Sequence, residues 1–295
     1  MRIWINGTFE QAESATITPF DAGFQHGVGL FETMLARGGS VFRMMDHLER
    51  LRESARELGL SERLRIDPLA EAIESTLLEN DLSDARIRLT ISGGNLNMLQ
   101  SPGQKAVDPT IVIAVQPPTR YPDEMFTDGV TVLVAEGRLN PLDRFSGHKT
   151  LNYWFRLSEL NRAAAAGAGE SIFCSVSNHL AGGCVSNIFL VKGDTLQTPI
   201  ARGEEPPGAL QSPVLPGVTR KFILQAVQAM GMTSEVRMLD VSDLMSADEI
   251  FLVNSSWGVL PVCNVEAHVV GDGQVGHRTG EFRKSWLEAV AAGDE

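Results

Sequence analysis

Lysine, cysteine and long apolar runs are all scarce in this sequence of 295 residues. The three cysteines, an odd number with no CxxC spacing, argue against a disulfide framework or a cysteine zinc site and suit a reducing compartment. No apolar run reaches the length of a membrane span, and the N-terminus lacks the apolar core of a signal peptide. We therefore expect a cytoplasmic protein without a membrane partner.

An excess of basic residues is also absent, because the formal net charge is −12. Such a chain offers no broad basic surface to neutralise phosphates, which argues against nucleic acid as a partner. The six histidines show no metal-ligand spacing, so we expect no metal site. What remains is an ordinary globular composition, 43% hydrophobic and 21% charged, in a chain long enough for two compact domains.

Apolar periodicity predicts a mixed α/β protein. Asn6-Gly7, between two short apolar segments, predicts a hairpin at the start of the chain. Further strands are predicted over 30–36, 41–43, 85–92, 110–115, 130–134, 171–176, 187–191, 235–239 and 250–253, and helices over 45–58, 67–79, 151–166, 219–230 and 279–290. This order is not the strict βαβ alternation of a doubly wound sheet, and neither GxGxxG nor GxxxxGK[ST] is present.

Residues 118–129 are the best candidate for an interdomain linker, because prolines, charges and a glycine gather there. The sequence therefore predicts an N-terminal α/β domain over residues 1–117 and a C-terminal α/β domain over residues 130–295.

Lys149 is one of only five lysines against twenty arginines. Unlike arginine, a desolvated lysine can lose its proton and attack a carbonyl as a neutral amine. The irregular segment 138–148 ends in small residues, which suits a loop folded into a cleft. The predicted helix after it, with Leu151 and Phe155 in the core, would hold Lys149 in place. The plainer alternative is a surface lysine at the start of a helix.

Two stretches could bind phosphate. Val214–Arg220 offers the start of a helix with a hydroxyl and backbone N–H groups, although Thr219 could equally be an ordinary N-cap. Ser255 and Ser256 follow a buried strand and offer two more hydroxyls. Arg50 lies between apolar helix positions, where a side chain that extends its charge to solvent is the plain alternative. An amine nucleophile with separate phosphate-binding elements is what pyridoxal 5′-phosphate (PLP) requires.

Six motifs in order make the sequence similar to the class IV aminotransferases, the fold-type IV PLP enzymes. The family contains branched-chain and D-amino acid aminotransferases and 4-amino-4-deoxychorismate lyase. The motifs are Asp21-x-Gly-Phe-x-x-Gly-x-Gly-Leu-Phe-Glu-Thr33, His47-Leu-x-Arg-Leu51, Lys149-Thr-Leu-Asn-Tyr153, Cys184-Val-Ser-Asn-Ile-Phe189, Leu215-Pro-Gly-Val-Thr-Arg220 and Asn254-Ser-Ser-Trp-Gly-Val-Leu-Pro-Val262. The resemblance implies a two-domain architecture like that of D-amino acid aminotransferase, with the lysine in the C-terminal domain, and a homodimer.

The resemblance also implies roles for particular residues. Lys149 would form the Schiff base with PLP and later carry the Cα proton. The cofactor contacts would come from Arg50, Tyr153, Asn187, Val218, Thr219 and Ser255. Candidates for contact with a small amino substrate are Thr33, Arg88, Asn254 and Ser256. Arg88 aligns loosely with an arginine near the substrate of branched-chain aminotransferases, and a structural strand arginine is the alternative.

One departure from the family pattern falls at Gly182. The family has a glutamate five residues before the asparagine of its Ser-Asn-x-Phe motif, where it holds a proton on the pyridine nitrogen. Three interpretations stay open. Another acid, Glu170 or Glu136, could approach the ring; the reaction could need less electron withdrawal; or transamination could have been lost.

The loop at Asn254 is more similar to that of the lyase than to that of branched-chain aminotransferases. In the lyase reaction an external aldimine loses its Cα proton, pyruvate leaves and an aromatic ring forms, which could tolerate a weaker electron sink. We therefore expect a PLP enzyme with a slight preference for 4-amino-4-deoxychorismate lyase. A branched-chain-type aminotransferase is the first alternative, and a non-catalytic or atypical relative is the second.

Overall fold

The structure is a computed structural model that describes residues 1–95 and 108–293, and it confirms the mixed α/β class. The chain divides into two compact units. The first contains Met1–Thr119, Lys149–Tyr153 and the C-terminus from Gly293, and the second contains Arg120–His148 and Trp154–Ala292. None of the helices in the described part of the chain has both the length and the apolar character that crossing a membrane requires.

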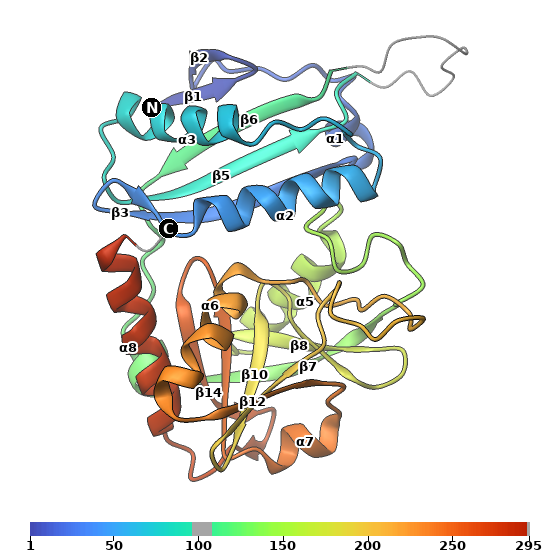
Figure 1. The fold of residues 1–295 in the computed structure, drawn as a ribbon, viewed down its shortest axis with the longest axis vertical. Coiled ribbons are helices and arrows are strands. Elements are labelled where there is room, and N and C mark those ends of the chain that lie inside the picture. The colour runs from blue at the N-terminus through green and yellow to red at the C-terminus, as the bar shows by residue number, and fades with distance from the viewer. Residues whose placement is uncertain (96–107, 294–295) are drawn as a thin grey trace. The chain divides into compact units, whose positions relative to one another are not determined.

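The first unit is an antiparallel sheet in the order β2-β1-β6-β5-β3-β4. Its elements are β1 (Arg2–Ile5), β2 (Thr8–Gln11), α1 (Ala22–His26), β3 (Gly29–Arg37), β4 (Ser40–Val41), α2 (Met44–Glu57), α3 (Asp67–Glu79), β5 (Ala85–Ser92) and β6 (Thr110–Gln116). Helices α2 and α3 lie across the sheet (Figure 1).

Strand β5 shows why the two faces of this sheet differ. Its residues alternate between fully buried apolar side chains, such as Ile87 and Leu89, and half-buried polar ones, such as Arg88 and Thr90. Because successive side chains of a strand point to opposite faces, the apolar set packs under α2 and α3 in the core. The polar set is left on the opposite face, where Arg88 and Thr90 can meet a ligand.

The second unit is a nine-stranded mixed sheet in the order β12-β11-β10-β13-β14-β7-β8-β9, with β15 paired to β14. Its strands are β7 (Val130–Leu139), β8 (Glu170–Ser175), β9 (Leu180–Gly183), β10 (Asn187–Lys192), β11 (Thr195–Pro199), β12 (Thr233–Arg237), β13 (Glu249–Asn254), β14 (Gly258–Val265) and β15 (His268–Val269). Its helices are α4 (Glu124–Thr127), α5 (Trp154–Ala165), α6 (Val218–Ala226), the 3₁₀ turn η1 (Gln228–Met230), α7 (Val241–Ser246) and α8 (His277–Ala292).

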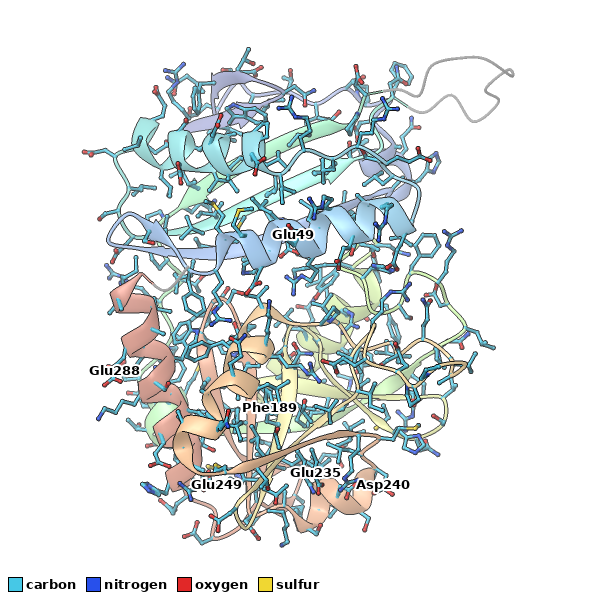
Figure 2. All side chains as sticks on the ribbon, in the orientation of Figure 1. Glu49, Phe189, Glu235, Asp240, Glu249 and Glu288 are labelled. Atoms are coloured by element: carbon cyan, nitrogen blue, oxygen red, sulfur yellow. The ribbon has the colours of Figure 1, made fainter. Side chains whose placement is uncertain are left out.

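Phenylalanine side chains connect this sheet to α8. The Phe189 ring of β10, labelled in Figure 2, stacks on Phe251 of β13 with centroids 5.1 Å apart, and the Phe282 ring of α8 is 5.4 Å from Phe251. Glu249, also labelled in Figure 2, accepts hydrogen bonds from the backbone N–H groups of Arg278 and Thr279. This carboxylate satisfies donors in the first turn of α8, so the helix has a defined start.

The helix that the sequence predicts from residue 151 begins at Trp154 instead. Residues 149–151 continue as an extended segment along β3, because Phe31 N–H donates to the carbonyl of Lys149 and Leu151 N–H donates to that of Gly29. These bonds group residues 149–153 with the first unit, whereas the residues before and after them belong to the second. The predicted domain bounds stay a prediction.

Most of the stretch predicted as a linker, residues 118–129, groups with the second unit, which begins at Arg120. The segment contains α4, and the Tyr121 ring packs edge-on against Phe126 and Trp257, with centroids 6.4 and 5.8 Å away. These contacts of the half-buried Tyr121 with Phe126 and with the buried Trp257 hold the segment against the second unit.

Candidate functional site

The candidate residues fall in both units, and each unit forms a polar constellation of its own. Thr33, Arg50, Arg88, Lys149 and Tyr153 belong to the first unit. Asn187, Val218, Thr219, Asn254, Ser255 and Ser256 belong to the second.

Lys149 projects over aromatic rings at the edge of β3. Its Nζ lies 4.3 Å from the centroid of the Phe31 ring and 5.6 Å from that of Tyr153. The two rings meet edge-on, with centroids 5.2 Å apart. Because the half-buried amine stands over the negative faces of two rings and its backbone is bonded to β3, its position is well defined.

Arg88 contacts the same Phe31 ring as Lys149. Its guanidinium carbon is 3.4 Å from the Phe31 ring centroid, and its Nε donates to Thr90 Oγ1 at 3.3 Å. Thr33 is directly across the strand pair from Arg88, so both side chains share a face. Burial lowers the pKa of Arg88 to about 10, which still leaves it charged at neutral pH.

No carboxylate within residues 1–95 and 108–293 forms an ion pair with Arg88. A partly desolvated guanidinium that stacks on an aromatic ring and has no acid partner suits the recognition of a ligand carboxylate. This contact pattern supports the substrate-contact interpretation of Arg88 over that of a structural strand arginine.

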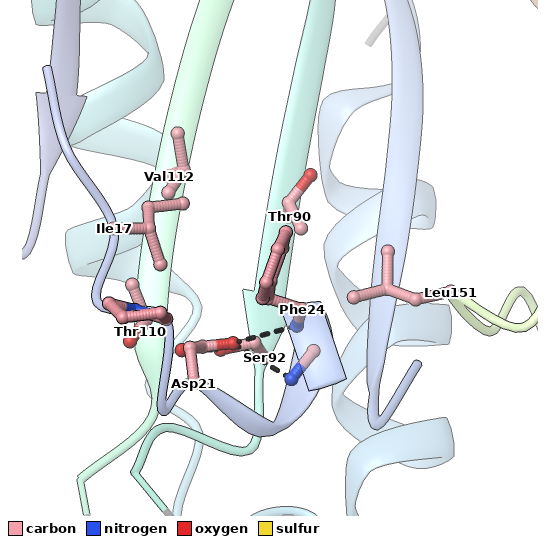
Figure 3. A pocket seen from close by; sticks show the side chains of 10 residues that line it. Ile17, Asp21, Phe24, Thr90, Ser92, Thr110, Val112 and Leu151 are labelled. Atoms are coloured by element: carbon pink, nitrogen blue, oxygen red, sulfur yellow. Dashed lines mark hydrogen bonds between the residues drawn. The ribbon is translucent and has the colours of Figure 1, made fainter. Parts of the chain in front are cut away.

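A cavity of about 300 Å³ lies on the same sheet face as Arg88 (Figure 3). Its walls are mostly apolar and are formed by Ile17, Pro19, Asp21, Gly23, Phe24, Thr90, Ser92, Thr110, Val112 and Leu151. Its polar floor is one buried pair, in which Ser92 Oγ donates to Asp21 Oδ2 at 2.6 Å. Thr90 lines the cavity and accepts a hydrogen bond from Arg88, so a carboxylate bound at Arg88 would have apolar space beside it.

The guanidinium of Arg50 donates hydrogen bonds to a buried acid, Glu32. Its Nε donates to Glu32 Oε1 at 2.9 Å and its NH2 group donates to Glu32 Oε2 at 2.5 Å, while His47 Nδ1 lies 2.8 Å from the same oxygen. Glu32 is 1% exposed. The interpretation of Arg50 as a helix arginine that reaches for solvent is therefore wrong, because its head group is bonded inward and its side chain is 10% exposed.

The pKa values in this group have clear physical causes. Burial raises the pKa of Glu32, but the Arg50 charge and the hydrogen bonds from His47 and Arg50 outweigh it and bring the pKa to about 2. Burial also lowers the pKa of His47. Around neutral pH the group thus consists of a carboxylate, a neutral imidazole and a guanidinium, which together fix the direction of Arg50.

In the second unit, the start of α6 is built like an anion site. Gly217 is the N-cap, its backbone is extended, and no side chain caps the first turn. Thr219 lies within that turn and is 2% exposed, and its Oγ1 is buried without a hydrogen-bond partner among the described residues. The interpretation of Thr219 as the N-cap is therefore wrong, whereas an orphaned hydroxyl beside uncapped N–H groups is typical of an anion site.

The turn Asn254–Trp257 lies near this site, because Asn187 donates to the carbonyl of Leu215 just before α6 and pairs with Val253 just before the turn. The side chain of Asn254 shapes the turn: its Oδ1 accepts from Ser256 N at 2.8 Å and from Trp257 N at 3.0 Å. Its Nδ2 donates to the carbonyl of Val185 at 3.3 Å. The predicted substrate contact of Asn254 stays a prediction, whereas its part in presenting Ser255 and Ser256 follows from these bonds.

Glu170 does not take the place of the missing acid at Gly182. Its carboxylate is fully buried, accepts from Cys184 N at 2.9 Å and from Ser186 Oγ at 3.0 Å, and burial raises its pKa. A Cβ on Gly183 would lie 2.9 Å from this carboxylate, whereas a Cβ on Gly182 would meet the backbone of Ser186. Because neighbouring strand residues point to opposite faces, the Glu170 carboxylate, which lies on the face of Gly183, is on the face opposite to the one that a Gly182 side chain would occupy.

Glu136, the other proposed acid, is exposed on β7, and β8 separates β7 from β9. The cationic side chain near this stretch is Arg156 of α5, whose NH1 donates to the carbonyl of Gly183 at 3.0 Å. The backbone of Gly182 has a φ of +118°, which side-chain-bearing residues rarely adopt. The interpretation in which Glu170 or Glu136 replaces the acid therefore finds no support in the geometry.

Glu32, His47 and Phe31 have no assigned role in the sequence analysis, although the structure places them around Arg50 and Lys149. A charged residue inside the otherwise apolar strand 30–36 was the available signal for Glu32, because buried acids need partners. For Phe31 the sequence offers no signal beyond an ordinary core aromatic.

A model of the amino-transferase class IV family matches residues 29–265. The solved branched-chain amino acid aminotransferase of Escherichia coli has a TM-score of 0.89 and 26% identity, and the match covers all of this chain and 96% of that one. The aminodeoxychorismate lyase of Bacillus subtilis is 27% identical over 266 residues, which are 90% of this chain and 86% of the relative. The solved 4-amino-4-deoxychorismate lyase of Pseudomonas aeruginosa has a TM-score of 0.83 and 26% identity, with 98% and 99% of the two chains covered.

Proposed function

This chain belongs to the class IV aminotransferase family, a family of PLP enzymes, and from that premise we propose that it is a 4-amino-4-deoxychorismate lyase. Family membership sets aside the alternative of a non-catalytic relative. The observation that carries the proposal is the geometry at Gly182, because Glu170 lies on the face of β9 opposite to the one that a Gly182 side chain would occupy and Glu136 is exposed on β7.

The residues present fit the cofactor. The orphaned Thr219 hydroxyl and the uncapped first turn of α6 suit a phosphate, because they supply an O–H group, N–H groups and the positive end of a helix. Ser255, in the turn Asn254–Trp257 of the same unit, would add a further contact. In the first unit Arg50, aimed by Glu32, offers a guanidinium to an anion. Lys149 would supply the amine that holds the cofactor, as the family resemblance implies.

When bound, PLP withdraws electrons from the carbon that carries the substrate's amino group. Lys149 Nζ would take the proton from that carbon. Phe31 and Tyr153 beside it hold the amine in a defined position. The C–O bond to the enolpyruvyl group then breaks, pyruvate leaves, and the ring becomes the aromatic 4-aminobenzoate.

Arg88 would bind a carboxylate of the substrate. Its guanidinium is stacked on Phe31 and braced by Thr90, and the cavity beside it offers apolar space for a ring. Thr33, directly across from Arg88, would line the same face.

The absence of an acid at Gly182 favours the lyase for an energetic reason. A carboxylate keeps the pyridine nitrogen protonated, and a protonated ring is the better acceptor for the electrons left by the Cα proton. Transamination depends fully on that acceptor. Lyase turnover also gains the stability of the aromatic product, so it tolerates a weaker acceptor.

A branched-chain-type aminotransferase is the second candidate. It is favoured by the similarity to the E. coli branched-chain aminotransferase over the whole chain, and by Arg88, which suits an amino acid carboxylate equally well. The homodimer expected from the resemblance stays a prediction, which light scattering on the holoprotein tests.

Two assays on the same holoprotein separate the candidates. In the first, 4-amino-4-deoxychorismate is supplied and pyruvate and 4-aminobenzoate are measured. In the second, branched-chain and other L-amino acids are supplied with 2-oxoglutarate, and glutamate is measured. We expect product in the first assay, its loss in Lys149→Ala and its retention in Lys284→Ala, an exposed control. Turnover in the second assay alone would refute the lyase and favour the aminotransferase.

A further inference from the structure

Asn187 connects the sheet of the second unit to the segment that leads into α6. It is the first residue of β10 and is 6% exposed. Its Nδ2 donates to the carbonyl of Leu215 at 2.9 Å. Its Oδ1 lies 2.0 Å from the point where a Cβ on Gly217 would stand. The amide therefore fills the space beside Gly217 and lies along residues 215–217.

The two ends of this connection differ in how firmly they are held. Asn187 pairs with Val253 of β13, and the ladder between β10 and β13 continues through Val191. The first turn of α6, in contrast, begins at Gly217 without a side-chain cap. The direction of that turn consequently depends on how residues 215–217 are tied to the sheet, and Asn187 supplies this tie.

That direction matters for any anion bound at the start of α6. The Thr219 hydroxyl and the first N–H groups donate usefully only when they converge on one point, within about 0.5 Å and 10–20°. A side chain that fixes the preceding segment thus sets the anion affinity without meeting the anion.

We propose that Asn187 is a positioning residue for the cofactor phosphate, which it orients through Leu215 and Gly217, and that position 217 must be glycine because a Cβ would displace the Asn187 amide. The inference rests on the proposed placement of the phosphate at the start of α6. It also assigns Asn187 an indirect role in place of the cofactor contact that the family resemblance implies.

The test compares PLP with pyridoxal, which lacks the phosphate, by fluorescence titration of the apoprotein. Losing one oriented hydrogen bond corresponds to about tenfold in affinity. We expect Asn187→Ala and Gly217→Ala each to weaken PLP about tenfold and to leave pyridoxal nearly unchanged. Because Gly217 has an ordinary φ of −70°, alanine is harmful there mainly through Asn187, whose Oδ1 lies 2.0 Å from the added Cβ, whereas the Cβ of Arg220 lies 3.3 Å from it. The double variant should therefore bind PLP no more weakly than the poorer single variant.

Two reference variants complete the test. Asn264→Ala makes the same change on β14 of the same sheet and should leave both affinities unchanged. Thr219→Val removes the proposed phosphate contact and should weaken PLP alone. If Thr219→Val has no effect, the phosphate placement itself fails. If Thr219→Val acts as expected but Asn187→Ala weakens the binding of PLP and pyridoxal equally, the positioning role alone is overturned. The same holds if the losses of PLP affinity in the two single variants multiply in the double variant. Asn187→Ser provides the same comparison should the alanine variant not fold.

Discussion

Replacing Glu32 with glutamine tests whether the buried group Glu32–His47–Arg50 holds the first unit together. The change keeps the shape of the side chain and removes its charge. Glu32 accepts two hydrogen bonds from Arg50 and lies 2.8 Å from His47 Nδ1, at 1% exposure. In the variant the Arg50 guanidinium stays buried without its counter-charge.

The size of the effect follows from two independent estimates. Removing one partner of a buried ion pair costs about 3–5 kcal/mol, because the remaining charge is left uncompensated. Lowering the pKa of Glu32 from its ordinary 4.5 to about 2 corresponds to about 3 kcal/mol of stability. We therefore expect the free energy of unfolding of the variant to be lower by about 3 kcal/mol at pH 7.

The lowered pKa of Glu32 also predicts how the difference in the free energy of unfolding changes with pH. Because the pKa of Glu32 is lower in the folded state, its contribution is complete above pH 4.5 and is lost as the pH falls from 4.5 to about 2. Glu32→Gln has no carboxylate at this position, so acid removes no such contribution from its free energy of unfolding. The difference between wild type and Glu32→Gln should thus be largest near pH 7 and shrink in acid.

Urea unfolding followed by circular dichroism at pH 7, 5 and 3 measures this difference. Glu79→Gln is the matched control, because Glu79 pairs with Arg2 in the same unit but is exposed, and such pairs contribute about 1 kcal/mol or less. A difference that stays constant from pH 7 to 3, or one no larger than that of the control, would refute the reasoning.

Three further predictions follow from the two units. Arg88→Gln should raise KM for the amino substrate about tenfold or more with a smaller effect on kcat, since it removes a ground-state carboxylate contact; steady-state kinetics measure both. Gly182→Ala should lower the free energy of unfolding by about 1–3 kcal/mol, because it forces a φ of +118° on a side-chain-bearing residue; urea unfolding against Gly280→Ala, which meets no neighbour, checks it. Glu170→Gln should be tolerated at neutral pH: burial raises the pKa of Glu170, so its carboxyl costs stability as the pH rises above its ordinary 4.5, and thermal melts should show the melting temperature of the variant rising relative to that of wild type as the pH increases above 4.5.

The sequence was most informative where periodicity is strong. Helix α3 and strand β5 begin and end where the pattern predicts, because Asp67-Pro68 marks a helix start and residues 85–92 alternate cleanly. It missed β9 and β11, whose strands are short and carry glycine, proline or mixed residues. Their strand character comes from neighbours in the sheet, which a local pattern does not contain.

For the site, the sequence by itself determined the family and predicted the lysine and the phosphate-binding stretch Val214–Arg220, because these depend on residue types in a fixed local order. Only the tertiary structure decided that Lys149 lies on β3 in the first unit, since backbone bonds to Gly29 and Phe31 bring it there from across the chain. It also decided that Glu170 points away from the face of Gly182, because the side of a strand on which a residue lies is set by pairing register. Contacts between distant residues fix both outcomes, and no spacing along the chain encodes them.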